Sequence, residues 1–414
     1  MNTVPRRILN KVLLALKNHP IVFLNGPRQA GKSTLVQALI QSDFPAEYVT
    51  FDNATQMAAA SHSPESFLGL RKGPLVIDEV QLVPDVFRAL KLTVDELRLK
   101  NPKESKGRFL LTGSANIMAL PKLSDALVGR VNIKTLYPFA SCEILNTPST
   151  FLEQLFALEF NTPPQHFSLD DVITKTTFPE ISQENLSYRT EWFENYISTL
   201  LQRDVRFLAE IEKIAFLPTL LRTLAARAGK LMNDAEISRD VGLNAITNKA
   251  YRSILQAMFL CFDVEPWYRN IGKRLVKSPK GFLTDTLLLC HLLDLNFETT
   301  RKNKPELYGH LLENYVATEL SKLLSFGNIR AKLMHFRTSD NKEVDFVLER
   351  PDASLSAIEV KASSRVNIHD FKGIQTLQEA AGNDFISGIV LYTGTEIVPF
   401  AQNLFAIPIS SLWY

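Results

Sequence analysis

A glycine-rich loop near the start of the chain constrains the fold more than any other feature. The segment Gly26-Pro-Arg-Gln-Ala-Gly-Lys-Ser33 matches the pattern G-x-x-x-x-G-K-[ST]. It follows the apolar residues 21–24 and precedes a helical pattern at residues 34–40. A strand, a tight loop and a helix in this order predict a parallel sheet with a phosphate-binding loop after its first strand.

Each residue type in this loop has a chemical reason. Glycines let the backbone wrap tightly, so that amide N–H groups and the helix N-terminus face the phosphates. Lys32 is expected to reach the β- and γ-phosphates, and the Ser33 hydroxyl is expected to bind Mg²⁺. The expected nucleotide-binding residues are Gly26, Pro27, Arg28, Gln29, Ala30, Gly31, Lys32, Ser33 and Thr34. The loop therefore predicts binding of a nucleoside triphosphate, ATP with Mg²⁺, and the alternative is a glycine turn without a ligand.

A buried acidic strand gives independent support. The run Pro74-Leu-Val-Ile-Asp-Glu79 is apolar until it ends in two carboxylates. Beside the loop, Asp78 would bind the metal, and Glu79 would orient or deprotonate the attacking water. The alternative is an acidic strand end that is solvated at the surface. The favoured interpretation extends the function from triphosphate binding to hydrolysis.

Two further elements are typical of a hydrolysis site. The run Phe109-Leu-Leu-Thr-Gly-Ser-Ala-Asn116 ends in small polar residues, so Thr112 or Ser114 is expected to sense the γ-phosphate or to position the water. Ordinary turn chemistry explains the same residues. Arg130 precedes the next expected strand and would neutralise transition-state charge, either in cis or from a neighbouring subunit. The alternative for Arg130 is a surface arginine.

These four elements, in this order, resemble the AAA+ ATPases. The resemblance is to a bacterial and archaeal branch with a G-P-R-Q-x-G-K-[ST] loop, an I-D-E-x-Q strand (residues 77–81) and an L-T-G-S strand (residues 111–114). Residues 126–130 are similar to the branch's S-L-x-G-R motif, with Ala126 in place of serine. The segment Leu136-Tyr-Pro-Phe139 with Glu143 is similar to its L-x-P-x-x-x-x-E. The resemblance implies an ATPase site and no settled biological role.

The rest of the N-terminal region supports an α/β fold. Expected strands cover residues 21–25, 48–52, 75–78, 108–112 and 131–135, with helical patterns between them. This alternation predicts the parallel sheet of a P-loop NTPase, with helices on both of its faces. Two polar, proline-bearing stretches at residues 146–150 and 161–171 then read as linkers.

The middle of the chain is expected to be helical. Long helical patterns cover residues 191–208 and 218–231, and a helix-turn-helix with its turn at Gly242 covers residues 235–260. The basic stretch at residues 268–282 could supply the strands of a wing. Arg239, Lys249 and Arg252 favour phosphate contacts with DNA, whereas nearby acidic residues offset that charge and favour a lid or a protein contact.

A second candidate site lies near the C-terminus. Asp345 and then Glu359-Val-Lys361 resemble the D-(x)n-E-x-K core of PD-(D/E)xK nucleases. Asp345 and Glu359 on neighbouring strands could hold Mg²⁺ or Mn²⁺, with Glu313 completing the acidic set. Lys361 would polarise a phosphate. The alternative is a retained fold that serves only for binding or dimerisation, because E-x-K is common on amphipathic strands.

The expected domains follow from these motifs and from the length of 414 residues, which exceeds one usual core. They are an AAA+ P-loop ATPase domain at residues 1–145, connecting helices at 146–215, a winged-helix-like domain at 216–303 and a nuclease-like domain with a mixed α/β fold at 304–414. The AAA+ resemblance extends over nearly all of them and implies a homo-oligomer.

The amino-acid composition limits the possible functions but does not indicate a binding partner. The net charge of +2 balances 46 basic against 44 acidic residues, so DNA contact would need local clusters of charge. Three distant cysteines, no apolar run of membrane length and no secretory signal predict a soluble cytoplasmic protein without membrane contact. Three hypotheses remain open: ATP hydrolysis that moves domains or partners, a nucleotide-gated metal-dependent nuclease, and a nucleotide-dependent scaffold.

Overall fold

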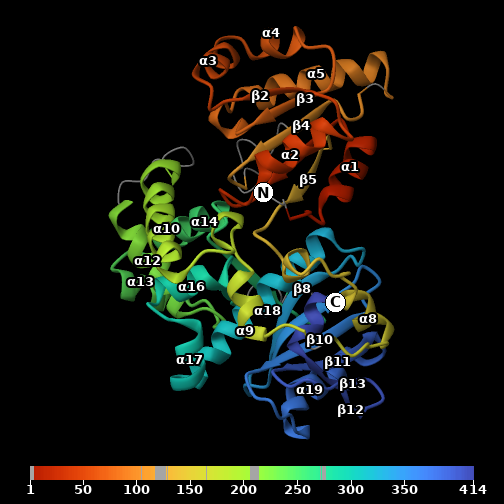
Figure 1. Ribbon diagram of the computed structural model, residues 1–414, viewed down its shortest axis with the longest axis vertical. Helices are drawn as coiled ribbons and strands as arrows, with labels where there is room; N and C mark the ends of the chain where they lie inside the picture. The colour runs from red at the N-terminus through yellow and green to blue at the C-terminus, as the bar shows by residue number, and fades with distance from the viewer. Residues whose placement is uncertain are drawn as a thin grey trace.

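The structure is a computed structural model that describes residues 4–103, 105–116, 127, 129–164, 166–205, 214–270, 272 and 277–414. The N-terminal sheet, red to orange in Figure 1, lies at one end of the molecule. The C-terminal sheet, in blue, lies at the other end, and the green helices of the middle region lie beside it (Figure 1).

A five-stranded parallel sheet forms the N-terminal part. In spatial order its strands are β2 (Glu47–Thr50), β3 (Leu75–Asp78), β4 (Phe109–Gly113), β1 (Ile21–Asn25) and β5 (Val131–Thr135). The predicted α/β fold is confirmed, and three of the five strands begin and end at the predicted residues. Because β1, β3 and β4 are neighbours, the three motifs that follow them meet at the carboxyl edge of the sheet.

Helices cover both faces of this sheet. The side chains of Val22 and Leu24 face α1 (Leu9–Asn18) and α2 (Lys32–Gln41). Ile21 and Phe23 face the other apolar cluster, which contains α3 (Ala54–His62), α4 (Pro64–Gly69) and α5 (Val86–Lys100). Successive strand residues point to opposite faces, so a run that is apolar throughout is buried on both sides.

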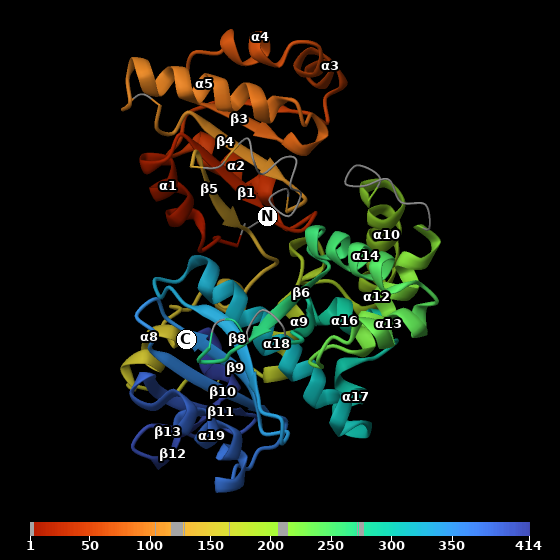
Figure 2. The same ribbon diagram turned by 180° about the vertical axis from the view of Figure 1, so that it is seen from behind.

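A mixed eight-stranded sheet forms the C-terminal part. Its spatial order is β12 (Val398–Ala401), β13 (Leu404–Pro408), β11 (Phe385–Tyr392), β10 (Leu355–Lys361), β9 (Glu343–Glu349), β8 (Lys332–Arg337), β6 (Cys261–Pro266) and β7 (Lys280–Leu283). Figure 2 shows β8 to β11 side by side. One face packs on α19 (Lys372–Ala381) and the other on α18 (Pro305–Phe326).

The middle region is helical, as predicted. Its helices are α8 (Phe151–Ala157), α9 (Leu169–Lys175), α10 (Leu186–Thr199), α12 (Leu217–Ala226), α13 (Asp234–Val241), α14 (Ala245–Ala257), α16 (Thr286–Leu292) and α17 (Phe297–Asn303). The turn between α13 and α14 is at Gly242, whose φ is +77°, as a C-terminal glycine cap requires. The predicted helix at 191–208 is wrong in its bounds, because α10 begins earlier and continues as a π-helix, Leu200–Asp204. Residues 206–213 lie outside the described residues.

The expected wing differs from the structure in position. Strand β7 covers residues 280–283, so it overlaps only the end of the predicted stretch, and its antiparallel partner β6 lies earlier, at residues 261–266. Strand β6 also pairs in parallel with β8, so the hairpin extends the C-terminal sheet. The strand propensities of residues 268–282 do not reveal which strands pair, because the position of the hairpin depends on the pairing of β6 with the distant strand β8. The basic residues Lys273 and Arg274 lie outside the described residues.

Across the part of the chain that the structure describes, no helix is both long enough and apolar enough to cross a membrane. The three cysteines, Cys142, Cys261 and Cys290, are buried and free.

Candidate functional site

The glycine-rich loop joins β1 to α2 in a conformation that needs glycine. Gly26 has φ +148°, and a Cβ there would lie 2.1 Å from the backbone oxygen of Leu136. Gly31 has φ +93° at the start of α2. The first N–H groups of α2 have no partner within the helix, so the loop ends in donors suited to an anion. Pro27 and Ala30 are buried in the loop, whereas Gln29 and Thr34 are exposed.

Lys32 is buried inside this loop without a direct counter-ion. Its side chain is held by two carbonyls, because Nζ donates to Gly26 at 3.0 Å and to Pro27 at 2.8 Å. Burial lowers the pKa of Lys32 to about 8, against the opposing effect of Glu79 and Asp78. Among the described residues, no carboxylate lies within ion-pair distance of Lys32. A buried ammonium in this state favours an incoming anion.

Asp78 lies at the carboxyl end of β3, facing the loop, and is only 4% exposed. Its carboxylate accepts hydrogen bonds from the Tyr48 hydroxyl at 2.6 Å and from the Thr112 hydroxyl. These donors fix its orientation, and burial and Asp78 together raise the pKa of Tyr48. With the hydroxyl of Ser33 at the start of α2, the donor set consists of oxygens that suit Mg²⁺.

Glu79 turns away from the strand immediately after Asp78. Its φ is +55°, which is uncommon for a residue other than glycine and redirects the chain. The carboxylate accepts hydrogen bonds from Gln81 Nε2 and, at 3.2 Å, from the hydroxyl of Ser114. The backbone N–H of Glu79 donates to Thr112 at 3.1 Å. The structure therefore brings together Asp78 and Glu79, at the end of β3, with Thr112 and Ser114, at the end of β4.

Arg130 lies at the other end of the sheet. The register aligns Val131 with Ile21, the first residue of β1, whereas the phosphate loop follows Asn25. Five strand residues span about 16 Å, so the arrangement does not support a role for Arg130 in cis. Its guanidinium forms two hydrogen bonds of 2.7 Å with Asp95 on α5. Of the similar motif around it, Ala126 and Val128 lie outside the described residues.

Arg6 connects the phosphate loop to the segment after β5. Its guanidinium donates to the Ala30 carbonyl at 2.7 Å, to the Tyr137 carbonyl at 2.6 Å and to Glu143 at 3.1 Å. Glu143 also accepts from the backbone N–H of Ala140. Arg6 therefore links the loop to residues 137–143 by direct hydrogen bonds.

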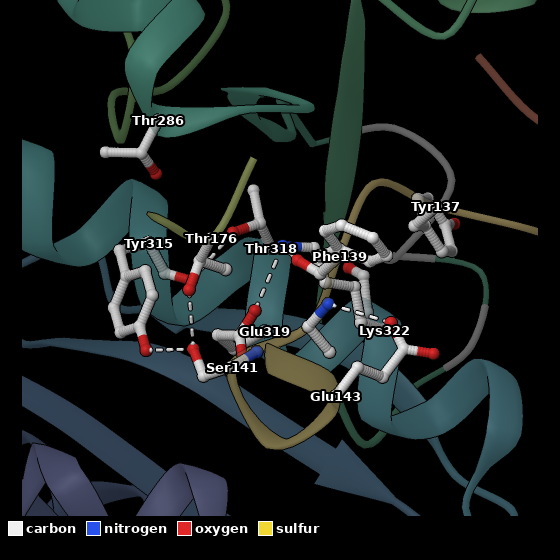
Figure 3. A network of polar contacts seen from close by, with 12 residues as sticks. Tyr137, Phe139, Ser141, Glu143, Thr176, Thr286, Tyr315, Thr318, Glu319 and Lys322 are labelled. Atoms are coloured by element: carbon white, nitrogen blue, oxygen red, sulfur yellow. Dashed lines mark hydrogen bonds and ion pairs between the residues drawn. The ribbon is translucent and has the colours of Figure 1, made fainter. Parts of the chain in front are cut away.

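The same segment is bound on its other side by α18. Ser141 donates its backbone N–H to Glu319 at 2.9 Å, and its hydroxyl contacts Tyr315 at 2.6 Å. Lys322 donates to the Phe139 carbonyl and forms an ion pair with Glu319 at 3.0 Å. Figure 3 shows these side chains around Ser141, Phe139 and Glu143. The junction between the N-terminal domain and the rest of the chain is therefore a buried polar network.

The predicted C-terminal residues also come together. Asp345 on β9 accepts a hydrogen bond at 2.9 Å from the backbone N–H of Val360, the residue between Glu359 and Lys361. Lys361 forms an ion pair with Glu359 at 3.0 Å. Burial and the nearby Asp345 raise the pKa of Glu359 and of Glu313.

A lysine lies at the centre of these carboxylates. Lys280 Nζ is 2.9 Å from Glu313, 2.5 Å from Glu343 and 3.0 Å from Asp345. Burial lowers the pKa of Lys280, but the three carboxylates outweigh it and raise that pKa well above its usual value. Within the described ranges, no group of three or more His, Cys, Asp or Glu side chains could hold a metal ion. The residues in this arrangement therefore do not fit the expected Mg²⁺ or Mn²⁺.

One expected DNA contact is wrong. Arg252 on α14 is 9% exposed and lies 3.7 Å from Asp234 and 3.5 Å from Asp263. An arginine that is buried and paired in this way is not available to phosphates. Its helical position does not reveal this, because Asp263 lies on β6.

Sequence reasoning missed the residues that support each site. They are Arg6, Tyr48, Gln81, Glu143 and Lys280. Gln81 and Glu143 belong to quoted motifs, so that signal was present, whereas Lys280 looked like one more cation in a basic stretch.

Three family matches divide the chain. Residues 18–145 match the family described as AAA domain, residues 166–299 match a domain of unknown function, DUF8612, and residues 308–412 match another, DUF4143. Uncharacterized proteins of Mycobacterium bovis and Mycobacterium tuberculosis are each 28% identical over 400 residues, which is 95% of this chain and 81% of each relative.

Solved structures with some likeness include a Walker-type ATPase of Pyrococcus abyssi, with TM-score 0.44, 12% identity, and coverage of 70% of this chain and 96% of that one. Cdc6p of Pyrobaculum aerophilum has TM-score 0.28, 13% identity, and coverage of 77% and 96%. These scores carry no functional argument. Residues 18–145 thus match the AAA domain family and have the parallel sheet and the strand–loop–helix of a P-loop NTPase fold.

Proposed function

We propose that this protein binds ATP with Mg²⁺ at the loop of residues 26–34 and hydrolyses it. The observation that carries the proposal is the environment of Lys32. A buried ammonium held only by two carbonyls faces the acids that end β3. A triphosphate would supply the negative charge that this ammonium lacks.

Different residues around the loop would bind the phosphates, hold the metal ion and activate the water. Lys32 and the N–H groups at the start of α2 would bind the phosphates, while Ser33 and Asp78 would hold Mg²⁺, which neutralises phosphate charge when bound. Glu79 would accept the proton of the attacking water, with Gln81 and Ser114 holding its carboxylate in place. Thr112 donates to the Asp78 carboxylate and accepts from the backbone N–H of Glu79, so it would hold the Asp78 side chain and the backbone turn at Glu79 in place.

We further propose that hydrolysis moves the other domains. The path that supports this runs from Ala30 through Arg6 and Glu143 to the network at Ser141 and Glu319. Arg130, far from its own loop, suits a role toward a neighbouring copy, so a homo-oligomer is part of the proposal. Arg239 and Lys249 remain the residues through which the helix-turn-helix would contact DNA phosphates.

The test compares two substitutions in a phosphate-release assay and an ATP-binding assay. Glu79→Gln should keep ATP binding and lower turnover by about 10²- to 10⁴-fold, because only the general base is lost. Lys32→Ala should abolish binding as well. Glu65→Gln, in the first turn of α4, is the matched control and should behave as wild type.

Full turnover by Glu79→Gln would overturn the assigned mechanism. Tight ATP binding without turnover by the wild-type protein would instead support the nucleotide-dependent scaffold.

A metal-dependent nuclease is the second candidate function. The observation that favours it is the contact between Asp345 and the backbone of the Glu359-Val-Lys361 segment, which places the expected residues together. Linear and branched DNA would be incubated with Mn²⁺ and either wild type or Lys361→Ala. Cleavage that is lost in the variant supports the candidate, and equal cleavage or none by both removes it.

A further inference from the structure

Lys280 lies on β7, at the edge of the C-terminal sheet, and its acidic partners lie on other elements of the C-terminal part. Its strand β7 is held by backbone hydrogen bonds between Gly229 and Gly281 at 2.9 Å and between Met232 and Pro279 at 2.8 Å. Glu313 comes from α18, and Glu343 and Asp345 come from β9. Lys280 therefore connects the edge strand β7 to α18 and β9.

The contact between Lys280 and Glu313 is buried and closely packed. Lys280 is 1% exposed, and Gly229 gives Glu313 its room, since a Cβ at position 229 would lie 2.7 Å from Glu313 Oε2. Gly229 also has φ +77°, which other residues rarely adopt. Desolvating a lysine so completely is costly unless carboxylates compensate it.

The position of the ammonium is the position that a metal ion would need. Three carboxylate oxygens from two chain segments, α18 and β9, converge on Nζ within 3.0 Å. Oxygen ligands of divalent cations converge in the same manner, at about 2.0–2.6 Å. An ammonium and a divalent ion cannot occupy this point together.

We propose that Lys280 is an internal cation that fills the divalent-metal position of this cluster, so that the cluster does not bind Mg²⁺ or Mn²⁺ while the ammonium is in place. The inference concerns regulation of the second candidate site and rests on the carboxylates assigned to it there. It explains why the cluster has all four expected residues and yet no free metal site in this conformation.

The charge balance supports this reading. Lys280 supplies one positive charge to a group that contains Glu313, Glu343, Asp345 and Glu359, with Lys361 paired to Glu359. Arg337 also forms an ion pair with Glu343 at 3.2 Å. Four carboxylates therefore face three cations, and a divalent ion in place of the ammonium would supply the missing positive charge.

The hairpin that carries Lys280 is connected to the N-terminal part and to the C-terminal sheet. The backbone N–H of Asn116, which follows β4, donates to the carbonyl of Ala257 at the end of α14 at 2.7 Å. Strand β6 follows shortly after α14 and pairs with both β7 and β8. Lys280 is therefore held beside the carboxylates by the position of β7 in the sheet.

The test measures Mn²⁺ binding to the full-length protein without nucleotide, by electron paramagnetic resonance of free Mn²⁺. Lys280→Met should bind one Mn²⁺ at least about 10-fold more tightly than wild type, a difference of about 1.4 kcal/mol. The added substitution Asp345→Asn should abolish that gain. Lys277→Met, an exposed lysine three residues earlier, is the matched control.

Thermal unfolding keeps the test decisive where the variant is unstable. Mn²⁺ should raise the midpoint of Lys280→Met above its value in EDTA by several degrees more than that of wild type. A second variant, Lys280→Met with Glu343→Gln, removes one positive and one negative charge together and should still show a gain over wild type, smaller than that of Lys280→Met because Glu313 and Asp345 remain.

The outcomes separate the inference from the nuclease candidate. Equal tight Mn²⁺ binding by wild type and Lys280→Met overturns the inference alone. Absence of binding in both, with no Mn²⁺ stabilisation, overturns the inference and removes the metal site as well. Mn²⁺ binding by Lys280→Met without DNA cleavage supports the inference and counts against the nuclease.

Discussion

Two buried lysines occupy opposite electrostatic situations in this chain. Lys32 is held by two backbone carbonyls, and burial lowers its pKa to about 8. Lys280 is surrounded by three carboxylates that raise its pKa well above the usual value. Within the part of the chain that the structure describes, the first lysine has no carboxylate at ion-pair distance, whereas the second has three.

The difference shows how burial of the same side chain can prepare a site or close it. A site that binds an anion needs an ammonium whose partner is missing, and the phosphate loop provides one because its carbonyls carry no net charge. A site that binds a cation needs carboxylates whose partner is missing, and Lys280 removes that condition. The first site can therefore accept an anion in this conformation, whereas the second cannot accept a cation, although both contain the residues expected from the sequence.

Replacing each lysine by methionine should give the largest contrast. Lys280→Met is expected to lower the free energy of unfolding by about 3–5 kcal/mol, because it leaves buried carboxylates without their counter-ion. Lys32→Met should change that free energy by less than about 1 kcal/mol, because the buried charge it removes has no ionic partner. Urea unfolding without nucleotide or metal measures both, with the exposed Lys103→Met as control. Equal losses in the two variants would contradict the comparison.

Removing one donor to Glu79 should have a smaller effect that is confined to the first site. Ser114 donates to Glu79 at 3.2 Å, beside Gln81. Ser114→Ala should lower kcat for ATP hydrolysis by about 10-fold, equivalent to one charge-assisted hydrogen bond, with KM unchanged. Steady-state phosphate release measures it, and Ser42→Ala on the same domain is the control. A change in KM alone would show that Ser114 acts on binding instead.

The sequence predicted the first site better than the second for a physical reason. The residues of the first site follow short apolar runs that can be recognised as strands from the neighbouring sequence alone. Parallel strands then bring Lys32, Asp78 and Ser114 to one edge of the sheet. Lys280 acts through β9 and α18, which lie 33 to 65 residues away in the chain. Nothing in its neighbours reveals that contact, and the same holds for Arg252 and Asp263. The position of Arg130, far from the phosphate loop, likewise becomes clear only from the pairing of β5 with β1 in the sheet.

The smallest predicted effect is a pH dependence that reports on the second site. His335 on β8 is 1% exposed and its ring contacts the Ser278 carbonyl. Burial and Lys280, with Arg337, lower the pKa of His335 to about 4, against Asp345 and the Ser278 carbonyl. The imidazole is therefore neutral in the folded state, while the unfolded state takes up a proton near pH 6.5.

Because the unfolded state binds more protons, stability is fully present above pH 6.5 and falls as the pH decreases toward 4. Between pH 7 and 5.5 the loss should be about 1 kcal/mol. Urea unfolding at both pH values measures it, and His335→Gln should lack this part of the loss while the exposed His369→Gln retains it. A wild-type slope that is unchanged in His335→Gln would show that the imidazole is not held neutral, and that the charge of Lys280 is screened from its neighbours.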